Sequence, residues 1–306
     1  MTFNTVNELN KNFSFRNESS ELIFREGPDN IPFVEITNAK ASAKISIQGA
    51  HVLSWMPHEQ ADVIWLSEDA KFEKGKSIRG GIPICWPWFG AHVSNNSFPA
   101  HGFARTVLWQ VVDTKSLSPD ETEITFRLSI DQQDEDIQKM WPRDTYVEYR
   151  LNISSELNLE LITFNNSLES ITIGQALHTY FNIEDINNTS VYGLENKTYL
   201  DKTDNFNSKV QKGSITIKNE VDRVYLDTPE KVMIDNGKRK IIISKEGSKS
   251  SIVWNPWEEV ANKMGDLGEN GYQKMLCVES ANAVNDTVTI KPSESYTMSA
   301  KYEIKK

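Results

Sequence analysis

The chain has 306 residues, of which 38% are hydrophobic and 25% are charged. These values are close to those of ordinary globular proteins, so the sequence can bury a large core and is not a disordered chain. There are 33 Lys and Arg residues against 43 Asp and Glu residues, which gives a net charge of −10. Because nucleic acid and anionic membranes would be repelled by this charge, we expect neither as a partner.

The cysteine content and the N-terminal segment indicate the compartment. The two cysteines, Cys85 and Cys277, form no CxxC pair and no disulfide framework of the kind found in small secreted proteins. The first residues lack the basic and apolar regions of a signal peptide, and no apolar run approaches the roughly eighteen residues that span a bilayer. The sequence therefore predicts a cytoplasmic protein.

After a polar, unperiodic lead-in over residues 1–20, apolar runs of strand length follow one another along the chain. Residues 123–130 and 147–153 alternate strictly between apolar and polar side chains, and a short turn joins the second run to residues 157–161, which predicts a hairpin. Further strands are expected at 22–24, 33–36, 43–47, 52–55, 63–65, 171–177, 214–218, 231–235, 239–244, 275–278, 287–290 and 296–304.

Helical patterns are few: only residues 132–140 and 257–264 suggest short helices. The sequence has no strand–helix alternation, no repeat of 20–50 residues and no low-complexity linker. We therefore predict an all-β fold, a large antiparallel β-sandwich with a few short helices, as a single domain over residues 21–306.

Residues 77–105 fit neither period, and glycines and prolines interrupt them throughout. Long ordered loops of this kind usually carry function. Arg79 and Arg105 would provide permanently charged groups suited to an oxyanion, and Trp86, Trp88 and Phe89 would provide flat apolar walls for a sugar ring.

Five segments of the sequence resemble, in order, motifs of one enzyme family: IRGGIPICWPWFG at 78–90, AHGFAR at 100–105, ALHTYFNI at 176–183, YLDK at 199–202 and CVESAN at 277–282. The family is the hexose-6-phosphate mutarotases, the glucose-6-phosphate 1-epimerase branch of the galactose mutarotase-like superfamily. The resemblance implies a galactose mutarotase-like sandwich. It also implies an isomerase that interconverts the α and β anomers of hexose 6-phosphates without a cofactor.

Two residues in these motifs are candidates for proton transfer. Taken alone, His178 beside two aromatic residues is more often structural than catalytic, and Glu279 at the end of an apolar run is equally a surface group or a site residue. The resemblance implies that His178 is the general acid and Glu279 the general base. Ring opening of a hemiacetal requires this combination, because one group must protonate the ring oxygen while another takes the C1 hydroxyl proton.

The resemblance also implies substrate-binding roles for Arg79, His101, Arg105 and Asp201. From the residues alone, Asp201 would be a turn aspartate, and His101 could equally brace the loop. Some relatives carry a glutamine before the His-Gly of the second motif, where this chain has Ala100, so that contact is lost or supplied otherwise.

The expected ligand is a hexose 6-phosphate, glucose 6-phosphate foremost, bound by a monomer. The sequence contains no dinucleotide, P-loop or HExxH motif, and its five histidines lack metal-site spacing, so we expect no cofactor and no metal. Two alternatives remain open: a sugar-phosphate-binding regulatory module without turnover, and a glycoside hydrolase that uses Asp201 and Glu279 as paired carboxylates.

Overall fold

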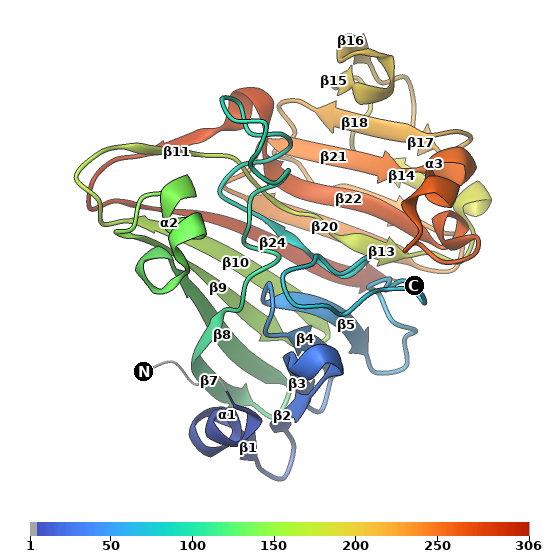
Figure 1. Ribbon diagram of the computed structural model, residues 1–306. Helices are drawn as coiled ribbons and strands as arrows, with labels where there is room; N and C mark the ends of the chain where they lie inside the picture. The colour runs from blue at the N-terminus through green and yellow to red at the C-terminus, as the bar shows by residue number, and fades with distance from the viewer. Residues whose placement is uncertain (1–4, 306) are drawn as a thin grey trace.

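Antiparallel strands make up most of the computed structural model, which describes residues 5–305 (Figure 1). This confirms the predicted all-β class. The described part of the chain has three α-helices, α1 (Val6–Phe13), α2 (Glu135–Met140) and α3 (Trp257–Met264). Short 3-10 helices lie at Pro28–Asn30, Ile130–Gln132, Ile186–Asn188, Lys202–Asp204, Gly271–Gln273 and Val284–Asp286. Within residues 5–305, no helix has the length and apolar character needed to cross a bilayer.

A nine-stranded sheet forms one layer, in the order β17-β14-β19-β20-β24-β10-β9-β8-β7. Its strands are β17 (Ile215–Thr216), β14 (Ser190–Tyr192), β19 (Val232–Asp235), β20 (Lys240–Glu246), β24 (Ser295–Lys305), β10 (Glu156–Asn165), β9 (Thr145–Ile153), β8 (Glu121–Ser129) and β7 (Gln110–Ser118). The predicted hairpin is confirmed, because Leu157 of β10 pairs with Ile153 of β9.

Two further sheets contain most of the remaining strands. The five-stranded sheet runs β1 (Phe15–Arg16), β2 (Glu21–Glu26), β3 (Pro32–Thr37), β4 (Ala41–Ser46) and β5 (His51–Pro57). The eight-stranded sheet runs β16 (Asn207–Val210), β15 (Thr198–Asp201), β18 (Val221–Tyr225), β21 (Ser250–Asn255), β22 (Met275–Asn282), β12 (Gln175–Leu177) and β6 (Ile84–Cys85), with β13 (Tyr180–Asn182) also paired to β22. A separate pair joins β11 (Ile171–Ile173) to β23 (Val288–Ile290).

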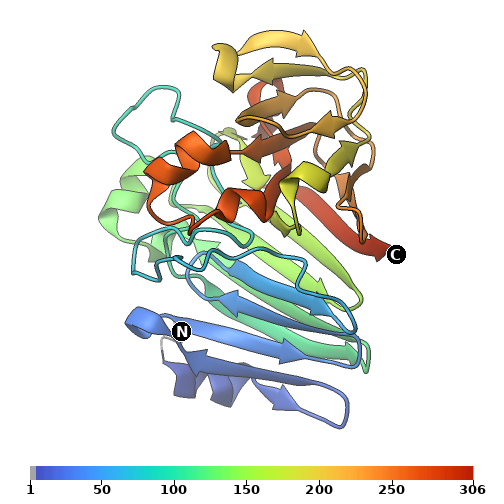
Figure 2. The ribbon, with the colours of Figure 1, turned by 90° about the vertical axis from the view of Figure 1, so that its right-hand side faces the viewer.

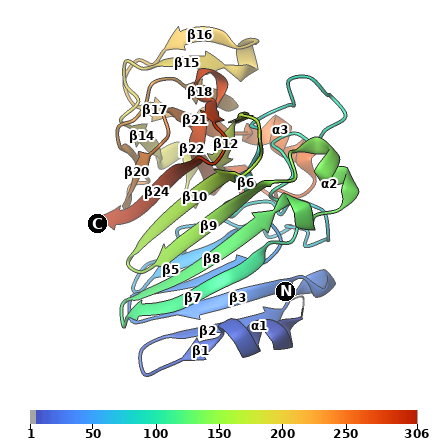
Figure 3. The same cartoon turned by 90° about the vertical axis from the view of Figure 1, so that its left-hand side faces the viewer.

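The core lies between these layers (Figures 2 and 3). One continuous cluster of buried side chains includes Ile36 of the five-stranded sheet, Leu159 of the nine-stranded sheet and Val278 of the eight-stranded sheet. The alternation along β9 and β10 produces this arrangement, because every second side chain of each strand is buried. The sandwich predicted from this alternation is therefore the observed architecture.

The lead-in before residue 21 differs from the extended or frayed segment that was predicted. Residues 6–13 form α1, whose first turn is closed by a capping box between Thr5 and Glu8. The helix packs against β2 and β7, and its one fully buried residue, Leu9, joins the main core. Val6, Leu9 and Phe13 have the i, i+3, i+7 spacing of one helix face and all pack on the core, so this spacing was a signal that the sequence interpretation missed. Residues 1–4 of the lead-in lie outside the described part.

Candidate active site

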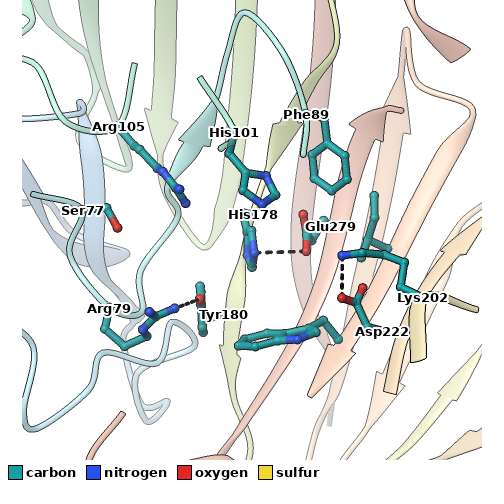
Figure 4. A pocket seen from close by; sticks show the side chains of 12 residues that line it. Ser77, Arg79, Phe89, His101, Arg105, His178, Tyr180, Lys202, Asp222 and Glu279 are labelled. Atoms are coloured by element: carbon teal, nitrogen blue, oxygen red, sulfur yellow. Dashed lines mark hydrogen bonds and ion pairs between the residues drawn. The ribbon is translucent and has the colours of Figure 1, made fainter. Parts of the chain in front are cut away.

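A cavity of about 260 Å³ gathers side chains from three parts of the chain (Figure 4). The loop 77–105 contributes Arg79, His101 and Arg105, and the paired strands β12 and β22 contribute His178 and Glu279. A third group comes from β15, β18 and β21 and the residues that follow them. The structure thus brings together five of the six residues predicted for the site.

Strand register places His178 beside Glu279. In the antiparallel β12–β22 pair Leu177 faces Ser280, so the next residue on each side brings the two functional groups opposite one another. His178 Nε2 lies 3.4 Å from Glu279 Oε1. The other carboxylate oxygen, Oε2, is buried and has no hydrogen-bond partner in the described chain, so it is available to a ligand.

Burial controls the protonation of this pair. Desolvation, with the negative charge of Asp222 next in size, raises the pKa of Glu279 well above its usual value. Desolvation also lowers the pKa of His178 well below its usual value, and the nearby His101, Arg105 and Arg79 lower it further. An acid and a base with strongly displaced pKa values, together in one cavity, are typical of an active site.

His51, a buried residue at the start of β5, contacts the backbone of the loop that carries the arginines. This buried imidazole bonds the carbonyl of Gly80 at 2.8 Å, and burial lowers its pKa to about 4, so it is neutral. Gly81 adopts a φ of +72° and packs so closely on His51 that a Cβ would overlap the ring. The two glycines therefore let the chain turn tightly between the cavity and the core.

The two arginines of the cavity have different partners. Arg79 donates through Nε to Asp266 and through Nη1 to the hydroxyl of Tyr180, both at 3.0 Å. Arg105 donates to the carbonyl of Ala100 at 3.0 Å and has no carboxylate partner within residues 5–305. Arg105 is thus the cation of the cavity whose charge is least compensated.

His101, near the C-terminal end of the loop 77–105, also lines the cavity. Its Nδ1 accepts a bond from the Gly90 amide at 3.3 Å, which leaves Nε2 to carry the proton. Burial, assisted by the charge of Arg105, lowers its pKa to about 3. His101 is therefore a neutral N–H donor, and its ring centroid is 6.0 Å from that of His178.

Asp201, the sixth predicted residue, does not line the cavity. Its carboxylate accepts bonds from Thr203 and from Lys209, the latter at 2.8 Å. The next residue, Lys202, lines the cavity instead and pairs at 2.5 Å with Asp222 of β18. Sequence reasoning missed both. Residues 221–225 do not alternate between apolar and polar side chains, so no local pattern assigned Asp222 to a face of the strand.

The apolar walls also differ from the prediction. Phe89 lines the cavity as expected, but Trp86 and Trp88 are buried in the main core. Trp254 of β21 supplies the other flat wall, with its ring 5.9 Å from His178 in an edge-on arrangement. An aromatic residue in a loop with many prolines gives no sign of which direction it faces.

Known sequences similar to this chain come from one family of sugar epimerases. Residues 32–303 match the family described as aldose 1-epimerase. The chain is 34% identical over 269 residues to a protein of Escherichia coli strain K12 named "Putative glucose-6-phosphate 1-epimerase", covering 86% of this chain and 87% of that one. A protein of Cenchrus ciliaris with the same name is 37% identical over 265 residues, covering 83% of this chain and 78% of that one.

Solved structures agree with these sequences. A structure described as a "putative mutarotase" from Salmonella typhimurium superposes with a TM-score of 0.86 at 27% identity, covering 98% of this chain and 99% of that chain. A galactose mutarotase related enzyme from Lactobacillus acidophilus shares the fold, with a TM-score of 0.68 at 16% identity, 89% coverage of this chain and 97% of its own. Family and names together support interconversion of sugar anomers. The chain belongs to the aldose 1-epimerase family.

Proposed function

We propose that this protein interconverts the α and β anomers of a hexose 6-phosphate, glucose 6-phosphate foremost, by acid–base ring opening and reclosure. The observation that carries the proposal is the His178–Glu279 pair, 3.4 Å apart in a cavity that also contains Arg79, Arg105 and Lys202. A matched acid and base provide the chemistry, and three cations suit a dianionic substrate.

The proposed reaction begins when the Glu279 carboxylate takes the proton of the C1 hydroxyl. His178 protonates the ring oxygen as its bond to C1 breaks, which leaves an open-chain aldehyde. Rotation about the C1–C2 bond presents the other face of the carbonyl, and reclosure reverses both proton transfers. The C1–O bond breaks and re-forms within the substrate, and only protons pass between substrate and protein, so the two side chains suffice without redox chemistry or group transfer.

The substrate's two ends would lie at opposite sides of the cavity. Ser77 lies between Arg79 and Arg105 on one side, and Lys202 and Asp222 lie near Glu279 on the other (Figure 4). We assign the phosphate to the first side, where Arg105 has no carboxylate partner in the described chain, and sugar hydroxyls to the Lys202–Asp222 pair. His101 would donate to a hydroxyl at the centre, and Phe89 and Trp254 would contact the apolar faces of the ring.

Exchange spectroscopy on the anomeric protons tests this function directly. The purified protein should accelerate α/β exchange of glucose 6-phosphate strongly and that of free glucose much less. Equal exchange of glucose 6-phosphate with and without protein would refute the proposal. A protein that binds the sugar phosphate without accelerating exchange would instead be the regulatory binding module considered above.

The hydrolase alternative is less well supported than it was from sequence. The two carboxylates it needs were Asp201 and Glu279, and Asp201 is engaged with Lys209 outside the cavity. Release of reducing sugar from an aryl glycoside would restore it. A cytoplasmic location and a monomeric state remain predictions from the sequence.

A further inference from the structure

Burial of the His178–Glu279 pair, 3.4 Å apart, disfavours the charges that ring opening requires of it. Burial raises the pKa of Glu279 and lowers that of His178, so the free protein favours a carboxylic acid beside a neutral imidazole. Ring opening requires the reverse, a carboxylate that accepts and an imidazolium that donates. Because Nε2 and Oε1 are only 3.4 Å apart, the proton can pass between the two groups with little movement of either.

Positive charge is concentrated on the His178 side of the pair. Arg79 donates to the hydroxyl of Tyr180, whose ring stacks on the imidazole of His178 with centroids 5.0 Å apart, and it is paired with Asp266 at 3.0 Å. Arg105 lies on the same side, above Ser77 in Figure 4, and has no carboxylate partner within residues 5–305. Lys202 lies on the Glu279 side, but Asp222 pairs with it. The local charges therefore oppose an imidazolium at His178.

The other titratable groups near His178 add no charge. His101 opposes an imidazolium at His178 only when it is itself protonated, and burial lowers its pKa to about 3, so it carries no charge near neutral pH. Burial raises the pKa of the Cys85 thiol to about 12, and it raises the pKa of the Cys277 thiol and the Tyr180 hydroxyl as well. Arg105, which has no carboxylate partner within residues 5–305, is thus the charge whose neutralisation would most change the preference of His178.

We propose that the phosphate of the substrate is an electrostatic switch for the acid: a dianion bound by Arg79, Arg105 and Ser77 lets the proton move from Glu279 to His178. This rests on the proposed function and explains how the site would select phosphorylated sugars. A dianion held by Arg79, Ser77 and Arg105 would lie nearer His178 than Glu279 (Figure 4), so it would favour positive charge on the imidazole more than it would oppose negative charge on the carboxylate.

The proton count balances over one ring opening. Glu279 first gives its proton to His178 Nε2. The resulting carboxylate takes the C1 hydroxyl proton, and His178 passes its proton to the ring oxygen as the C1–O bond breaks and C1=O forms. The pair ends as it began, with one proton on Glu279. The phosphate therefore contributes to kcat, beyond its contribution to affinity.

Histidine NMR measures the switch without turnover. With nitrogen-15-labelled histidine, His178 is titrated in the free protein, with 1,5-anhydroglucitol 6-phosphate and with 1,5-anhydroglucitol, neither of which has an anomeric hydroxyl. The His178 signal is assigned by its absence in His178→Gln. We expect the phosphorylated ligand to raise the pKa of His178 by at least about one unit, a tenfold change in protonation. The same titration in both complexes would overturn the proposal.

Arg105→Ala provides an activity test with opposite signs for two substrates. Removing this charge should slow exchange of glucose 6-phosphate yet speed exchange of free glucose by about tenfold, the equivalent of one pKa unit. Arg150→Ala, which removes an arginine paired with Glu160 on the nine-stranded sheet, is the matched control. A loss of both activities in Arg105→Ala would indicate a role in binding or structure alone and would refute the switch.

Added phosphite dianion gives an independent readout in the unaltered protein. Phosphite should accelerate glucose exchange in a saturable manner, after subtraction of its own catalysis measured with Glu279→Gln. If phosphite inhibits glucose 6-phosphate exchange but leaves glucose exchange unchanged, the switch is wrong and the proposed function stands. If glucose 6-phosphate itself is not exchanged, the proposed function fails first.

Discussion

At the scale of single residues, the site depends on polar groups that the fold leaves without partners. Glu279 Oε2 is buried and unbonded within the described chain, and Glu279 lies on β22, a strand whose residues are all buried. A carboxylate that costs this much to bury would be replaced by an apolar residue if only the fold mattered. Its presence is therefore best explained by chemistry.

Glu279→Gln tests that explanation, because the amide keeps the size of the side chain but cannot take a proton. We expect exchange of glucose 6-phosphate to fall by about 10²–10⁴-fold, the range typical of a lost general base. Binding of 1,5-anhydroglucitol 6-phosphate, measured by calorimetry, should be retained. A variant that exchanges anomers at the wild-type rate would remove Glu279 from the mechanism.

Two aspartates compete for the role of hydroxyl acceptor, and paired variants separate them. Asp222→Asn should raise KM for the sugar phosphate by about 10–100-fold, since a hydrogen bond to a charged group contributes about 1.5–3 kcal/mol. Asp201→Asn should change KM little, because Asp201 bonds Lys209 and Thr203 and does not line the cavity. The opposite ranking in steady-state kinetics would restore the sequence prediction for Asp201.

At the scale of elements, the loop 77–105 shows how far the sequence could be read. Its glycines and prolines correctly predicted an ordered, irregular segment, and four of its polar residues, Ser77, Arg79, His101 and Arg105, line the cavity. Which aromatic residue faces the ligand could not be predicted, since Trp86 and Phe89 have similar surroundings in the sequence and opposite surroundings in the fold. Lys202 and Asp222 were missed for a related reason: neither the 3-10 helix after β15 nor the non-alternating strand β18 indicates from sequence which side chains face a ligand.

Two parts of the loop 77–105 pack closely where Gly102 meets the backbone of Trp86, and we expect substitutions at this contact to lower the free energy of unfolding. Gly102 has a φ of +71°, and a Cβ there would overlap the carbonyl of Trp86. Gly213 has a similar φ of +66° but open space around it. Gly213→Ala should cost about 1–2 kcal/mol from its backbone conformation alone. Gly102→Ala should cost a further 1–3 kcal/mol or so from overpacking.

Urea denaturation of both variants checks this prediction, and anomer exchange provides a second readout. The Gly102 variant should also lose activity, because His101 and Arg105 flank the displaced backbone. Equal losses of stability in the two variants would show that the loop can relax away from Trp86.

At the scale of the whole molecule, the sandwich could be predicted because alternation was strong along the long central strands, as it is in β9 and β10. The order of strands in the sheets could not be predicted, since pairing between distant segments leaves no local pattern. The run at 63–65 shows the limit: it forms only an isolated bridge, Ile64 to Phe181, although its composition is that of a strand. The domain boundary at residue 21 stays a prediction.

Buried neutral histidines should make global stability depend on pH. The folded-state pKa of His51 is about 4, below its usual 6.5, so the unfolded chain binds a proton there as pH falls and the native state does not. Stability is therefore lost as pH drops below about 6.5, by about 2 kcal/mol between pH 7 and pH 5 for this one group.

The difference between wild type and His51→Gln isolates this contribution, since other titrating groups cancel. The variant should be less stable at pH 7, but its free energy of unfolding from urea denaturation should fall less between pH 7 and pH 5. Parallel stability curves for the two proteins would contradict the prediction.

The position of β24 has a consequence for how the protein is made. This strand, residues 295–305, lies between β20 and β10 near the middle of the nine-stranded sheet. Until it is inserted, the strands on either side have no common neighbour and their backbone amides face water. During synthesis the nine-stranded sheet therefore stays in two unjoined halves until these residues have left the exit tunnel of the ribosome, and the sandwich can close only after that.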